Sequence, residues 1–94
     1  MKASFLVLNI ATNLERLCRF STEGKTERVD QFLKQTDDYF RTLKKMPVNK
    51  NFRPTLVRFE KEMKVLKSGD KTSYQWAEKA LTWANILTHH AKLA

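Results

Sequence analysis

The chain has 94 residues, of which 41% are hydrophobic and 30% are charged, and its net charge at neutral pH is +8. This length suits one domain with a modest core, and the apolar fraction excludes an intrinsically disordered chain. Two glycines and two prolines are too few for the many turns of an all-β protein, so the composition favours a few long helices.

Cys18 is the single cysteine of the chain. No disulfide can form within the chain, which favours a reducing compartment, and we predict a cytoplasmic protein. The apolar run at residues 5–8 is much shorter than a membrane span and lacks the features of a signal peptide. The sequence therefore predicts no membrane partner.

The first predicted helix covers residues 3–21. Its apolar stripe is formed by Leu6, Ile10, Leu14 and Leu17, with Val7 and Cys18 at its side. Asn13 lies off this stripe. Phe5 and Leu8 also lie outside it, so we expect the first turn either to be buried on all sides or to begin as a strand. Gly24 follows the helix and is expected to cap its C-terminus, since glycine adopts positive φ at little cost.

The second predicted helix covers residues 26–45, with Thr26 as its expected N-cap. Its buried face consists of Val29, Phe32, Leu33, Thr36, Phe40 and Leu43. The opposite face contains two acid-before-base pairs four residues apart, Asp30 with Lys34 and Asp37 with Arg41. Such pairs stabilise an exposed helix by a few tenths of a kcal/mol each, so this face is expected to be solvated rather than catalytic.

A break at residues 46–53 separates this helix from a third one, predicted at residues 54–67 with Pro54 in its first turn. We expect Phe52 to pack against the end of the bundle rather than to stack on a nucleic acid. The buried stripe of the third helix consists of Leu56, Phe59, Met63 and Leu66.

The fourth predicted helix covers residues 73–91 and follows a turn at residues 68–71. Thr72 and Gln75 have the spacing of a capping box at its start. Its stripe consists of Trp76, Ala80, Trp83 and Leu87, flanked by Ala77, Ala84 and Ala91. Together the four segments predict an all-α protein, a single-domain antiparallel four-helix bundle over residues 1–94. The alternative is a flatter packing in which the third helix crosses the others.

Most of the net charge lies between residues 41 and 67. This segment has nine basic and two acidic residues, which amounts to +7 of the total +8. Two exposed valines are expected beside the basic residues of the third helix. The candidate surface for an anion or a partner consists of Arg41, Lys44, Lys45, Lys50, Arg53, Val57, Arg58, Lys61, Lys64 and Val65. Two interpretations stay open: a binding surface, or a basic surface that only confers solubility.

No motif in the sequence indicates catalysis or a cofactor. His89 and His90 are adjacent, so on a helix they point about 100° apart and are poorly placed to chelate one metal ion. Cys18 is expected to be a buried, inert thiol. No glycine-rich phosphate loop is present, because the only glycines are Gly24 and Gly69. We therefore expect no cofactor, no metal, no small-molecule substrate and no enzymatic activity.

These observations predict a small interaction or regulatory module that binds a protein partner or forms a homodimer. The alternative is a nucleic-acid-binding protein that uses the same basic surface, in which case its affinity would fall steeply with salt.

Overall fold

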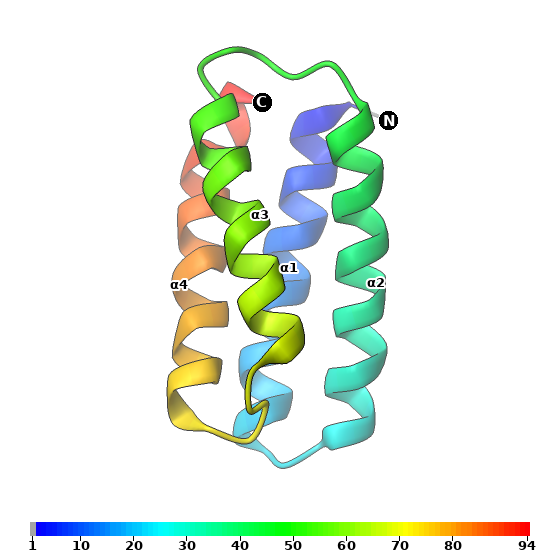
Figure 1. Ribbon diagram of the computed structural model, residues 1–94, viewed down its shortest axis with the longest axis vertical. Coiled ribbons are helices and arrows are strands. Elements are labelled where there is room, and N and C mark those ends of the chain that lie inside the picture. The colour runs from blue at the N-terminus through cyan, green and yellow to red at the C-terminus, as the bar shows by residue number, and fades with distance from the viewer. Residues whose placement is uncertain (1) are drawn as a thin grey trace.

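The apolar stripes of the sequence become four helices in the computed structural model, which describes residues 2–94 (Figure 1). The helices are α1 (Ala3–Thr22), α2 (Thr26–Lys45), α3 (Arg53–Ser68) and α4 (Tyr74–His90), and a short 3₁₀ helix, η1 (Ala91–Leu93), follows α4. Each helix runs antiparallel to the one before it, and α3 lies along its neighbours rather than across them. The predicted antiparallel four-helix bundle is thereby confirmed.

The bundle is elongated, measuring 37 × 20 × 19 Å, and its two ends differ in their connections. One end, here named the loop end, contains the start of α1, the end of α2, the loop at residues 46–52, the start of α3 and η1 (Figure 1). The opposite end, the turn end, contains the two short connections at residues 23–25 and 69–73.

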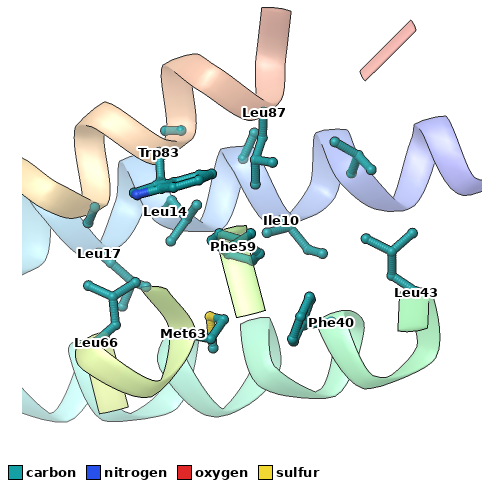
Figure 2. Close-up of a cluster of buried hydrophobic side chains, with 14 of the residues drawn as sticks. Ile10, Leu14, Leu17, Phe40, Leu43, Phe59, Met63, Leu66, Trp83 and Leu87 are labelled. Atoms are coloured by element: carbon teal, nitrogen blue, oxygen red, sulfur yellow. The ribbon is translucent and has the colours of Figure 1, made fainter. Parts of the chain in front are cut away.

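All four helices contribute to one core (Figure 2). Phe59 of α3 lies at its centre, with its ring perpendicular to that of Phe40 at 5.2 Å and tilted against that of Trp83 at 5.5 Å between centroids. Ile10 and Leu14 of α1 line the opposite wall. Such aromatic pairs add about 0.5–1.5 kcal/mol beyond the burial of their area.

The helices approach one another to different degrees because their core side chains differ in size. The backbones of α1 and α4 come closest, since α4 buries the small residues Ala77, Ala80 and Ala84. By contrast, α3 is held farther from α2 and α4 by the large side chains of Phe59 and Met63. Thus α1 is the central packing element, and α3 makes the fewest close backbone contacts among the four helices.

Gly24 ends α1 as predicted. Its φ of 73° places it in the left-handed region. The N–H of Lys25 donates to the carbonyl of Phe20 at 2.9 Å, and the N–H of Gly24 donates to that of Ser21 at 3.1 Å. These two bonds form a Schellman motif, which satisfies carbonyls that the helix end would otherwise leave free.

Both predicted N-caps are wrong. Thr26 is already the first residue of α2, and Lys25 before it makes no side-chain capping bond. At α4 the cap is Ser73, whose hydroxyl accepts the N–H of Trp76 at 3.1 Å. Thr72 instead donates its hydroxyl to Asp70 within the preceding turn, at 2.6 Å. That local bond removes Thr72 from the capping position and moves the helix start by one residue.

The start of α1 also differs from the sequence expectation. It is helical from Ala3 and is not buried on all sides, because Phe5 and Leu8 are 56% and 40% exposed. Conversely, Asn13 is buried, since α2 covers the flank of the α1 stripe on which it lies. Its amide donates to Gln35 Oε1 at 3.0 Å, and its Oδ1 accepts from Arg16 at 3.2 Å.

Smaller differences concern α3 and Cys18. Leu56 is only half-buried, whereas Thr55 is buried and its hydroxyl lies 3.0 Å from Nδ1 of His90. Cys18 is half-buried rather than fully buried. The prediction for Phe52 is confirmed, because its side chain is fully buried at the loop end.

Among the helices of residues 2–94, none combines the length and the apolarity needed to cross a bilayer.

Candidate interaction surface

The outward side of α3 is an uninterrupted basic surface. We name it the α3 face, and it consists of Arg53, Val57, Arg58, Lys61, Lys64 and Val65, all exposed. Val57 is 56% and Val65 is 42% exposed. The helix is held in place by its opposite side, where Phe59, Met63 and Leu66 enter the core. The α3 face therefore presents four cations and two valines on a helix that the core holds in place.

The two acids of the basic segment lie on the flanks of α3 and are directed to neighbouring helices. Glu60 forms an ion pair with Lys44 of α2. Glu62 lies 3.8 Å from the ammonium of Lys79 on α4. On the same side as Glu62, the guanidinium of Arg58 lies 5.5 Å above the ring of Trp83. Neither acid belongs to the α3 face, although Glu60 borders it closely enough for the charge of Lys64 to lower the pKa of its carboxyl.

A groove of about 220 Å³ runs between α2 and α3 over the side chains of Phe40 and Met63. Asp37 bridges its walls, because its carboxylate pairs with Arg41 at 3.1 Å and with Lys67 at 3.2 Å. Of the two predicted helical pairs, that of Asp37 and Arg41 is present, whereas Asp30 and Lys34 form no ion pair within residues 2–94, and Asp37 also ties α2 to α3. The charge of Arg41 is therefore partly offset by Asp37, which it shares with Lys67, although its side chain stays exposed to solvent.

The ion pair of Glu60 lowers the pKa of its carboxyl below the ordinary value. The hydrogen bond from Lys44 is the main cause, and the charges of Lys44 and Lys64 act in the same direction. A carboxyl whose pKa is lowered by folding adds stability above its unfolded pKa, and this contribution disappears as the pH falls through the folded pKa.

Replacing Glu60 with glutamine is therefore expected to reduce the stability slightly at neutral pH and not at acidic pH below the folded pKa. The effect is small because the pair is exposed to solvent. Urea denaturation at both pH values measures it. Glu15→Gln, at an exposed position with no ion pair among the described residues, is the control. Equal losses for Glu60→Gln at both pH values would contradict the assignment.

The ten predicted surface residues do not share one side of the bundle. Six form the α3 face, while Arg41 and Lys44 take part in the ion pairs beside α3. Lys45 and Lys50 are exposed at the loop end. The structure adds Lys2 and Lys92, which are distant in sequence but come to the same end because the first and last helices are antiparallel. The sequence pattern alone could not place Lys2 and Lys92 beside Lys45 and Lys50, because that placement depends on how the helices are arranged.

This arrangement segregates charge along the bundle. Residues 2–8, 44–55 and 86–94 form the loop end and contain six basic residues and no acid. The other described residues contain twelve basic residues and all ten acids. Most of the net positive charge of the chain therefore belongs to the loop end, where its field attracts anions.

Other reactive side chains are dispersed. Within residues 2–94, no three His, Cys, Asp or Glu side chains are grouped in a way that could hold a metal ion. A hollow of about 360 Å³ at the turn end lies beside Phe20, Val29 and Lys71.

Comparisons of the chain with known protein families, curated proteins and solved structures found no match.

Proposed function

We propose that the protein is a non-enzymatic interaction module whose α3 face binds an acidic segment of a partner protein. The observation that supports this proposal is the composition of that face: four cations and two exposed valines on one helix, with no acid among them. Apolar side chains rimmed by charges of one sign are typical of a site for a partner of opposite charge.

The exposed valines favour a protein over a nucleic acid. Single-strand binding relies on aromatic side chains that stack on bases. The basic segment at residues 41–67 has two aromatic residues, Phe52 and Phe59, and both are buried. Val57 and Val65 can contact an apolar side chain of a partner, whereas they add little to phosphate binding. The alternative, nucleic acid, is supported by the unpaired charges of Lys61 and Lys64 and is separated by the experiment below.

Self-association through this face is disfavoured by charge. Two copies that met across α3 would place four cations opposite four cations, and like charges brought together at an interface cost several kcal/mol. An acidic protein other than a second copy of this chain is therefore the better fit.

The lone half-buried thiol of Cys18 agrees with a reducing compartment, and we propose that the protein acts in the cytoplasm.

Selection from a displayed peptide library tests the proposal. We expect the wild-type protein to enrich peptides that combine Asp or Glu with aliphatic residues. A variant with Val57→Ser and Lys61→Gln is expected to bind the selected peptides about tenfold more weakly, since it loses an apolar contact and a charge. The matched control, Leu81→Ser with Lys34→Gln, changes an exposed leucine and an exposed lysine outside α3 and is expected to bind normally.

The same two proteins are then tested with single-stranded and duplex oligonucleotides at low and moderate salt. Binding to oligonucleotides that is weakened by Val57→Ser with Lys61→Gln, without enrichment of acidic peptides, would replace the proposal with the nucleic-acid alternative. Peptide enrichment that both variants retain would show that the α3 face is not the site.

A further inference from the structure

Exposed apolar side chains gather at the loop end, away from the α3 face. Phe5 and Leu8 are on the outward side of the first two turns of α1, with exposures of 56% and 40%. At a rise of 1.5 Å per residue, both lie within about 8 Å of the start of the helix. Leu93, 37% exposed, follows in η1, which contacts α1. Folding thus leaves two leucines and a phenylalanine uncovered at one end.

The same end carries lysines without acidic neighbours. Lys2 precedes α1, Lys45 ends α2, Lys50 lies in the loop and Lys92 lies in η1, and all four are exposed. None of them forms an ion pair with another residue of the described chain, 2–94. The loop and the last residue are joined, because the N–H of Asn49 donates to the carbonyl of Ala94 at 3.5 Å. The four lysines therefore lie at the same end of the bundle.

We infer that the loop end binds the surface of an anionic lipid bilayer. Phe5, Leu8 and Leu93 enter the region between headgroups and acyl chains, and the lysines contact lipid phosphates and carboxylates. Binding of this type requires apolar side chains that reach about 5–10 Å into the interface together with cations near the surface, and the loop end has both. Such binding needs no spanning segment, and it would replace the prediction from the sequence that the protein has no membrane partner.

Charge and side-chain type favour lipid over the other possible partners. A second copy would bring two acid-free ends together, and their positive charges repel. Leucines add little to nucleic-acid binding, which depends on phosphate contacts and stacking, yet they partition readily into lipid. The inference is independent of the proposed function, because none of its residues belongs to the α3 face.

Co-sedimentation with vesicles tests the inference on the full chain. We expect binding to vesicles that contain phosphatidylserine in phosphatidylcholine, weaker binding as salt rises, and no binding to phosphatidylcholine alone. Phe5→Ser with Leu8→Ser is expected to weaken binding about tenfold through loss of apolar insertion. Lys2→Gln with Lys50→Gln is expected to weaken it and to reduce its salt dependence. All these positions are exposed, so thermal denaturation should show that the variants fold normally.

Matched controls change the same residue types elsewhere. Tyr74→Ser with Leu81→Ser alters exposed apolar residues outside the loop end, and Arg28→Gln with Lys34→Gln alters exposed cations. Both are expected to bind vesicles normally, as is Val57→Ser with Val65→Ser, which separates this site from the α3 face. Equal weakening by the controls, equal binding to uncharged vesicles, or binding of oligonucleotides but not vesicles through the loop end would overturn the inference.

Discussion

Replacing Phe59 with alanine is expected to lower the free energy of unfolding by about 3–5 kcal/mol, the range for removing a large aromatic side chain from a packed core. Phe59 is 1% exposed and its ring contacts both Phe40 and Trp83. Because these two residues are on α2 and α4, the truncation removes contacts that hold α3 to both neighbours. A small domain is stable by about 5–15 kcal/mol in total, so the variant is expected to be close to unfolding.

Urea denaturation followed by circular dichroism measures this effect. Val57→Ala is the matched control, because it truncates a side chain on the same helix that is 56% exposed. Its stability is expected to change by no more than about 0.5 kcal/mol. If Phe59→Ala lost as little as this control, the bundle would not be organised around Phe59, and α3 would be held by its ion pairs with α2 instead.

The fold could be predicted from the sequence because burial in a helix repeats every 3.6 residues. The stripes at Ile10, Phe40, Phe59 and Trp83 marked four helices, and glycine at residue 24 marked a turn that needs positive φ. The features that failed depend on neighbours that a helical wheel does not contain. Asn13 is buried because α2 covers it, and Gln35 of α2 accepts the hydrogen bond that its buried amide needs.

The caps failed for a related reason. Thr72 had the correct spacing for a capping box, but the carboxylate of Asp70 competes for its hydroxyl and binds it locally. Short polar side chains often have several backbone or side-chain partners within two residues, and small energy differences choose among them. Helix interiors are therefore more predictable from sequence than helix ends.

The candidate surface was only partly predictable. The excess of lysine and arginine at residues 41–67 is visible in the sequence. The helical pattern also predicted that Val57 and Val65 are exposed, and they are. Which cations remain unpaired depends on contacts between helices, such as those of Asp37 with Lys67 and of Glu60 with Lys44. The separation of charge along the bundle depends on the antiparallel topology. Sequence order thus predicts where charge is abundant, and the fold decides where it is uncompensated.

Replacing Phe52 with alanine is also expected to cost about 3–5 kcal/mol, although the residue precedes a helix rather than lying within one. Its side chain is fully buried, and its carbonyl accepts the N–H of Leu56 at the start of α3. The ring therefore fixes both the loop at residues 46–52 and the entry into α3.

The control for Phe52 is Phe5→Ala, the same truncation at a position that is 56% exposed, which is expected to change stability by about 0.5 kcal/mol or less. Urea denaturation gives both values, and amide hydrogen exchange locates the damage. We expect Phe52→Ala to speed exchange first in the opening turns of α3, because they lose their anchor while α1 and α4 keep their close packing. Uniform acceleration across all four helices would instead show that the loop end unfolds only together with the whole bundle.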